Sequence, residues 1–160
     1  MILPEEQGIG LRTAEENDFE VLLALRIVAM RPSLERIGRY DAARARDRFR
    51  AGFDAGATRH IVLDGRDVGF VALKTDRAPW LLDHLYLLPE AQGRGVGAAV
   101  LARLFSEADR AAAALRVGAL RVGALRGSDA NRFYQRHGFV QVAEQEWDIY
   151  YLRAPRPGAA

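Results

Sequence analysis

Three glycines at alternate positions follow an apolar segment, a pattern typical of a site that binds anions. Residues 81–88 predict a strand, and Gly93, Gly95 and Gly97 come shortly after it. Glycine allows backbone N–H groups to approach a ligand closely. The Ala- and Leu-rich run over residues 96–113 predicts a helix, whose first turn directs free N–H groups and the positive end of its dipole toward the same place. The spacing therefore predicts a backbone site for the phosphates of a cofactor.

Two common phosphate-binding motifs do not fit this turn. Its Gly-x-Gly-x-Gly spacing differs from the dinucleotide fingerprint, and it lies in the middle of the chain instead of the first strand–helix unit. The Gly-Lys-Ser/Thr of a nucleotide P-loop is also missing. A tight turn that opens a helix, without a ligand, is the alternative for this segment taken alone.

A second pattern lies downstream, at residues 128–139. Ser128 and Asp129 are good N-cap residues, residues 130–137 predict a helix of about two turns, and Gly138 predicts its end. This short helix carries a Phe-Tyr pair and leads directly into a strand.

With both motifs in this order, the chain resembles the GNAT-type N-acetyltransferase superfamily over residues 60–152. Residues 92–97 match the family's Gln/Arg-x-x-Gly-x-Gly/Ala turn. The family's Asn-x-x-Ala-x-x-Phe-Tyr-x-x-x-Gly-Phe segment is matched at Ala130, Phe133, Tyr134, Gly138 and Phe139. Gly127 stands where the family has Asn, so Ser128 or Asn131 is the candidate for that polar contact to pantetheine.

The resemblance implies one α/β (α+β) domain over residues 1–153, with a mixed, mostly antiparallel seven-stranded sheet and helices on both faces. Residues 154–160 are expected to form a disordered tail. Strands are predicted at 9–13, 59–64, 67–75, 81–88, 120–126, 139–145 and 146–152. Helices are predicted at 15–30, where Pro32 ends the helix, and at 42–53, 96–113 and 130–137.

A five-residue tandem repeat, Leu-Arg-Val-Gly-Ala, occupies residues 115–119 and 120–124. A repeat of odd length exchanges the two faces of a strand, so only one copy can keep the regular register. The copy nearer the second motif is predicted to form the strand. The first copy is then expected to extend the connection or to form a bulge.

The resemblance also implies acetyl-CoA as the cofactor. Backbone N–H groups of residues 93–98 would bind its pyrophosphate, with Arg94 adding charge. The strand before the turn would pair with the pantetheine amides, and the N–H of Leu87 or Leu88 would polarise the thioester carbonyl. Gln92 is expected to shape the turn. The expected cofactor-binding residues are Leu85, Tyr86, Leu87, Gln92, Gly93, Arg94, Gly95, Val96, Gly97, Ala98, Ser128, Asn131 and Tyr134.

The implied reaction is direct attack of a primary amine, from a small molecule or a protein, on the thioester. An alkylamine has a pKa of about 10 and must lose a proton first, so a base is needed. Asp83 and His84 are the candidates, and strand alternation places them on opposite faces. Tyr134 would protonate the leaving thiolate. Candidates to line the acceptor site are Arg26, Met30, Glu35, Tyr40, Trp80, Trp147, Asp148 and Tyr150. The alternative is a non-catalytic acyl-CoA-binding sensor or subunit domain.

Composition limits the other classes of function. The chain has 160 residues, 49% hydrophobic and 28% charged, typical of one soluble domain. It has no cysteine, which excludes disulfides and a thiol nucleophile, and its three histidines are too scattered to predict a metal site. Basic residues alternate with acidic ones, which argues against nucleic-acid binding. Without a signal core or an apolar run of membrane-spanning length, we expect a cytoplasmic protein. A homodimer is left open.

Overall fold

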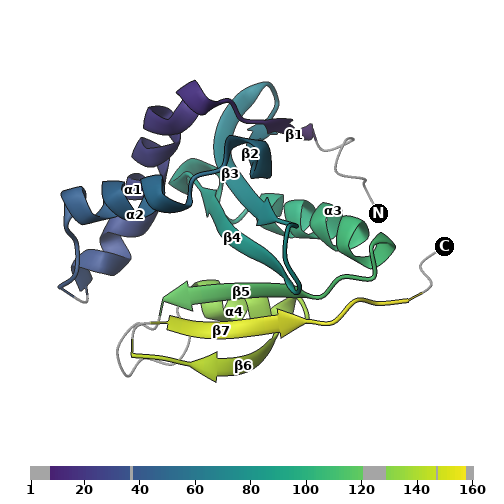
Figure 1. The fold of residues 1–160 in the computed structure, drawn as a ribbon. Coiled ribbons are helices and arrows are strands. Elements are labelled where there is room, and N and C mark those ends of the chain that lie inside the picture. Colours follow the sequence, from purple (N-terminus) through teal and green to yellow (C-terminus); the bar gives the residue numbers. More distant parts are fainter. Residues whose placement is uncertain (1–7, 37, 121–128, 147, 158–160) are drawn as a thin grey trace. The chain divides into compact units, whose positions relative to one another are not determined.

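Seven strands form one mixed sheet in the hydrogen-bonded order β1-β2-β3-β4-β5-β7-β6 (Figure 1). The computed structural model describes residues 8–36, 38–120, 129–146 and 148–157. The strands are β1 (Ile9–Thr13), β2 (Thr58–Leu63), β3 (Arg66–Lys74), β4 (Trp80–Leu87), β5 (Leu115–Leu120), β6 (Val140–Glu144) and β7 (Asp148–Arg153). The helices are α1 (Phe19–Arg36), α2 (Ala42–Gly52), α3 (Val96–Arg110) and α4 (Asp129–Arg136). The pairing of β4 with β5 is parallel, whereas β1–β2, β2–β3, β5–β7 and β6–β7 are antiparallel. The predicted fold class is confirmed.

The chain divides into two compact units whose boundary passes through β3, β4 and α3. Unit 1 comprises Met1–Ala72 and His84–Val100, and unit 2 comprises Leu73–Asp83 and Leu101–Ala160. Among the described residues, none of the helices combines the length and the hydropathy of a membrane span.

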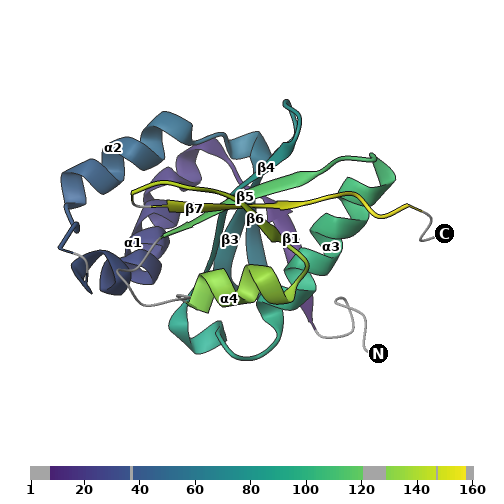
Figure 2. The same ribbon diagram turned by 90° about the horizontal axis from the view of Figure 1, so that it is seen from below.

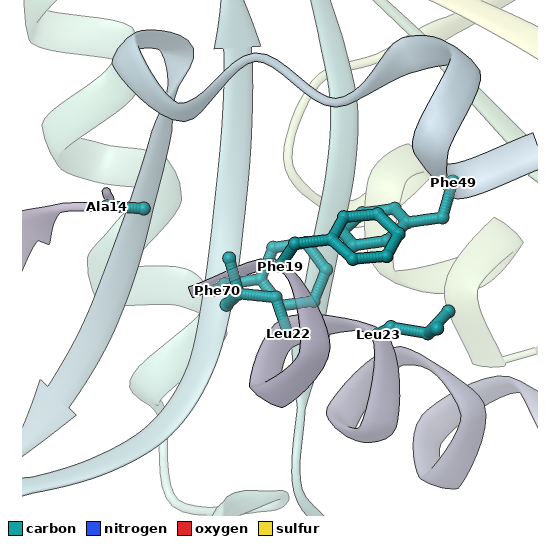
Figure 3. Packing of buried hydrophobic residues seen from close by; sticks show 6 residues of the cluster. All are labelled: Ala14, Phe19, Leu22, Leu23, Phe49 and Phe70. Carbon is teal, nitrogen blue, oxygen red and sulfur yellow. The ribbon is translucent and has the colours of Figure 1, made fainter. Parts of the chain in front are cut away.

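The core of unit 1 is aromatic. Phe19, Leu22 and Leu23 of α1 lie three and four residues apart, so one helix face carries all of them. Figure 3 shows this face turned toward Phe49 of α2 and Phe70 of β3. The rings of Phe19 and Phe49 stack with centroids 5.3 Å apart, and Phe70 lies 5.7 Å from Phe49. These contacts attach both helices to β3.

Helix α1 differs from its prediction at both ends. A short 3-10 turn (Glu16–Asp18) precedes it, and the helix continues through Pro32 to Arg36. A proline inside a helix removes the hydrogen bond to the residue four positions earlier, which here is Val28. Both residues are exposed, so water can take the place of the lost bond. The prediction that Pro32 ends the helix was therefore wrong.

Two local predictions in unit 1 are confirmed. The Asp41 side chain caps α2 by accepting a hydrogen bond from the backbone N–H of Arg44 at 3.1 Å. The β2–β3 hairpin turns at Asp64 and Gly65, whose φ angles of 51° and 82° are those of a type I′ turn.

In unit 2 the first copy of the tandem repeat forms strand β5, contrary to the prediction. Its residues pair in continuous register with β7, from Leu115 opposite Arg153 to Leu120 opposite Asp148. Only four residues separate α3 from β5, so the chain reaches the sheet with the first copy. Leu115 and Val117 then point into the core, where both are almost fully buried. Residues 121–128, most of the second copy among them, lie outside the described part of the chain.

Helix α4 lies on one face of the β5–β7–β6 ribbon (Figure 2). It ends as predicted at Gly138, whose φ is 93°. The N–H of Phe139 donates to the carbonyl of Tyr134 at 3.1 Å, and the N–H of Gly138 donates to Gln135. This pair of bonds is a Schellman motif, which requires the left-handed residue that glycine supplies.

The segment after β7 is held in place through Asp109. Arg153 donates to both carboxylate oxygens of Asp109 at 2.9 and 3.1 Å, and the backbone N–H of Arg156 donates to the same carboxylate at 3.0 Å. Residues 154–157 follow β7 without a further helix or strand. Residues 158–160 are not described.

Candidate functional site

The glycine-rich turn leaves the end of β4 and leads into α3. After a 3-10 turn (Pro89–Ala91), residues 92–95 are exposed. Gly93 and Gly95 have φ angles of 72° and 78°, a conformation that other residues rarely adopt. A Cβ added to either glycine would meet no protein atom within 4 Å. The space beside the turn is therefore open to a ligand.

The first turn of α3 offers N–H groups to that space. The N–H of Ala99 donates to the carbonyl of Gly95 at 3.1 Å, so Gly95 is the N-cap residue. A glycine has no side chain with which to cap the helix. The N–H groups of Val96, Gly97 and Ala98 consequently have no intrahelical acceptor, and they lie at the positive end of the helix dipole. A pyrophosphate fits this donor set, and the exposed Arg94 lies within the same turn.

The backbone of β4 has one edge that β3 does not use. The N–H of Leu88 donates to the carbonyl of Val68 at 2.8 Å, which directs Leu88 toward β3. N–H directions alternate along a strand, so the N–H of Leu87 points to the opposite edge. The parallel pairing of β4 with β5 runs from Trp80 to Leu82, and Leu85 and Leu87 lie beyond it. Of the two donors predicted for the thioester carbonyl, Leu88 is thus already occupied, and Leu87 remains.

Gln92 and Gly69 fix the shape of this strand end. Gln92 Nε2 donates to the carbonyl of Leu87 at 3.0 Å, which confirms that Gln92 shapes the turn. A Cβ on Gly69 of β3 would lie 2.2 Å from the carbonyl oxygen of Tyr86. Sequence reasoning did not identify Gly69, although an isolated glycine within a strand is a signal of close backbone approach.

The side chains of His84 and Tyr86 point to the α1–α2 side of β4. The His84 ring lies 5.4 Å from Phe49 and 5.8 Å from Phe70, and the Tyr86 ring lies 5.6 Å from His84. The Tyr86 hydroxyl donates to Sδ of Met30 at 3.1 Å. These contacts bring three predicted site residues, Met30, His84 and Tyr86, into one cluster.

Asp83, the other candidate base, lies in unit 2. Its carboxylate is 3.4 Å from Nζ of Lys74, and both side chains are more than two-thirds buried. Alternation along the strand turns Asp83 away from the face that His84 occupies. Asp83 is therefore held in an ion pair on a different face from the aromatic cluster.

The other predicted acceptor residues are distributed over both units. Arg26 lies one helical turn before Met30, with its guanidinium 5.8 Å from the Phe49 ring centroid. The guanidinium of Arg31, which lies 4.6 Å from the ring centroid of Tyr40, also binds Glu35. In unit 2, Trp80 begins β4, and Asp148 and Tyr150 belong to β7. Trp147 lies outside the described residues.

Unit 2 holds the remaining predicted cofactor residues. Tyr134 is 7% exposed, and its ring contacts those of Phe133, Phe139 and Tyr151. Asn131 is buried and its Oδ1 accepts a 2.5 Å hydrogen bond from the Tyr151 hydroxyl. That oxygen is engaged in the core of unit 2, and the role of Asn131 at pantetheine stays a prediction. Ser128 lies outside the described residues.

His60 belongs to a structural cluster in unit 1. Its buried ring lies between Asp18, with Nε2 3.1 Å from the carboxylate, and Asp67, with Nδ1 3.8 Å away. The pKa of Asp18 is lowered mainly by the hydrogen bond from the backbone N–H of Glu15, and to a smaller extent by the hydrogen bond with the His60 ring. Hydrogen bonding from Arg12 is the main cause of the lowered pKa of Asp67. The cluster joins β1, β2 and β3 to the turn before α1.

Comparisons with known proteins identify the family. A family model for the acetyltransferase (GNAT) domain matches residues 56–141, which contain the glycine turn and the α4 motif. The chain belongs to the GNAT acetyltransferase family. Acetyl-CoA, the acetyl donor of GNAT proteins, is therefore its cofactor. No curated protein matches the chain in sequence.

Solved structures share the fold of this GNAT domain at low identity. PaiA N-acetyltransferase from Thermoplasma acidophilum, in complex with coenzyme A, matches with a TM-score of 0.72 and 18% identity. The match covers 91% of this chain and 98% of the PaiA chain. An acetyltransferase from Thermus thermophilus has a TM-score of 0.68 and 19% identity, covering 91% and 96%. N-acetylglutamate synthase from Neisseria gonorrhoeae, complexed with coenzyme A and L-arginine, has a TM-score of 0.63 and 19% identity, covering 95% of this chain and 34% of its own.

Proposed function

We propose that this protein is an N-acetyltransferase that transfers the acetyl group of acetyl-CoA directly to a primary amine of a small molecule or a protein. The observation that carries the proposal is the turn between β4 and α3. There, an N-cap without a side chain leaves the backbone N–H groups of the first helical turn without a helical acceptor, and the space beside Gly93 and Gly95 is open. Family membership supports acetyl transfer, and the amine acceptor is the proposed part.

The backbone of unit 1 would bind the cofactor. N–H groups of residues 93–98 hold the pyrophosphate, and Leu85, Tyr86 and Leu87 pair with the pantetheine amides. When bound, acetyl-CoA supplies an activated acetyl thioester. The N–H of Leu87 stabilises negative charge on the thioester oxygen, because that donor is fixed before the reaction begins.

His84 is the base that we propose, acting directly or through one water. The acceptor amine must be neutral to attack, and imidazole is the side chain best suited to accept a proton near neutral pH. His84 shares its face of β4 with Tyr86, whose hydroxyl contacts Met30 of α1, whereas Asp83 is paired with Lys74. The family resemblance supports Tyr134 as the acid that protonates the leaving thiolate.

Two measurements test this function. Acetyl-CoA and CoA, but not NAD⁺, should raise the melting temperature, because a ligand at about 100 times its Kd stabilises the fold by about 2.7 kcal/mol. Tyr134→Phe should then reduce acetylation of an amine and retain the CoA-induced shift. If neither CoA species changes the melting temperature, the turn does not hold this cofactor. Full CoA binding without turnover of any amine would favour the sensor alternative.

A further inference from the structure

Arg26 is a half-buried cation on the inner face of α1. Its guanidinium carbon lies 5.8 Å from the centroid of the Phe49 ring. Its Nε atom is buried and has no hydrogen-bond partner among the described residues. A guanidinium stays charged at any physiological pH, so burial cannot be relieved by loss of a proton. A buried charged donor without an acceptor is costly, which makes this position favourable for an anion.

Other ring-stacked arginines of α1 and α2 each bind a carboxylate of the chain itself. The guanidinium of Arg50 lies 4.7 Å from the Phe19 ring centroid and pairs with Glu16 at 3.0 Å. Arg46 stacks on the same ring and pairs with Glu20. Arg26 makes a similar aromatic contact, and no carboxylate among the described residues completes it.

A chain of side-chain contacts connects Arg26 with His84, the proposed base. The Phe49 ring contacts both groups: its centroid lies 5.8 Å from the guanidinium carbon of Arg26 and 5.4 Å from the centroid of the His84 ring. Met30, one turn after Arg26, accepts a hydrogen bond from Tyr86, whose ring lies 5.6 Å from His84. All of these residues belong to unit 1.

We propose that the acceptor is a small amine that also carries a carboxylate, as an amino acid does, and that Arg26 binds this carboxylate. The inference rests on the proposed N-acetyltransferase activity and specifies its acceptor class. A carboxylate can accept two parallel hydrogen bonds from a guanidinium, including one from the buried Nε. Binding there orients the substrate with its amine toward His84.

The acceptor test uses matched sets of compounds. Each set contains an L-amino acid, its primary amide and the amine that lacks the carboxyl group. Thiol release from acetyl-CoA measures turnover. The acid should have the highest kcat/KM of its set, by about ten- to hundredfold, the range expected for a hydrogen bond to a charged group. Amides or simple amines used as well as the acids would overturn the inference.

Variants of Arg26 then assign the preference to this side chain. Arg26→Met keeps the length and the contact with Phe49, and should raise the KM of the acid with the KM of acetyl-CoA unchanged. Arg26→Lys should raise the KM of the acid less than Arg26→Met does, because lysine keeps the positive charge but lacks the planar pair of donors. Arg50→Met removes a similarly stacked arginine that already has its carboxylate, and should leave the acceptor profile unchanged. An unaltered profile in Arg26→Met would overturn the inference.

A binding readout separates this inference from the proposed function. In the presence of CoA, the preferred amino acid should raise the melting temperature of the natural protein but not of Arg26→Met. Both proteins should show the same shift with CoA alone, which also reports that the variant folds. If CoA gives no shift in either protein, the proposed function fails. If CoA binds and no carboxylate-bearing amine is bound or acetylated, only the inference about Arg26 fails.

Discussion

Gly95→Ala tests whether the glycine turn holds the cofactor. The φ of Gly95 is 78°, where an alanine is strained by about 1–2 kcal/mol. Since a Cβ at Gly95 meets no protein atom within 4 Å, the strain is purely conformational. In the free variant the turn can relax, and binding must then restore the strained form. One or two kcal/mol is a factor of about 5–30, so the affinity for acetyl-CoA should fall by up to that factor. Any strain that the free turn retains should appear as lost stability instead.

Two other glycines provide matched controls. Gly38 has a φ of 71° and equally open surroundings, so Gly38→Ala should lose similar stability without losing affinity. Gly10 in β1 has open surroundings and no positive φ, so Gly10→Ala should lose neither. Urea unfolding measures the stability of each variant, and calorimetric titration with acetyl-CoA measures its affinity.

The stabilities and affinities of the three variants together test whether the glycine turn holds the cofactor. If Gly95→Ala keeps the stability of the natural protein and also binds acetyl-CoA as tightly, the left-handed turn does not form the phosphate site. If Gly38→Ala loses affinity as well, the effect of strain is global and the argument from the turn is refuted.

Three further outcomes are expected. Gly69→Ala should lower the free energy of unfolding by about 1–3 kcal/mol in a urea titration, because the new Cβ would lie 2.2 Å from the Tyr86 carbonyl oxygen. A variant as stable as the natural protein would contradict the close approach of β3 and β4 at Gly69. Asp109→Asn should cost about 3 kcal/mol, since it leaves the 4%-exposed Arg153 side chain without its carboxylate, whereas Glu16→Gln in an exposed pair should change little. Arg153 lowers the pKa of Asp109, so this pair stabilises the fold above the usual aspartate pKa of about 4. Acid unfolding should show that this stabilisation is lost as the pH falls through the lowered pKa. Asp109→Asn should show no such loss.

Local signals in the sequence predicted the parts of the site that depend on neighbouring residues. The Gly93–Gly97 turn, the Asp64-Gly65 hairpin, the Asp41 cap and the Gly138 helix end all appear where they were predicted. Each follows from the allowed dihedral angles or hydrogen bonds of a few adjacent residues. The family resemblance rests on two of these segments, which is why the fold class could also be predicted.

Other features required contacts between residues far apart in the chain. The two copies of the repeat have the same propensity, and the first one forms β5 because it follows α3 after four residues and pairs with β7. The ion pair of Asp83 with Lys74 and the contact of His84 with the Phe49 ring also join residues that lie apart in the chain.

The sequence by itself thus determined the glycine turn and its helix, because backbone conformation is decided within a few residues. The burial of Arg26 beside Phe49, the use of Asn131 by Tyr151 and the occupation of the Leu88 N–H by Val68 were decided only by the tertiary structure. Burial and hydrogen-bond partnership depend on elements that approach each other only in the folded chain, and no local pattern specifies them.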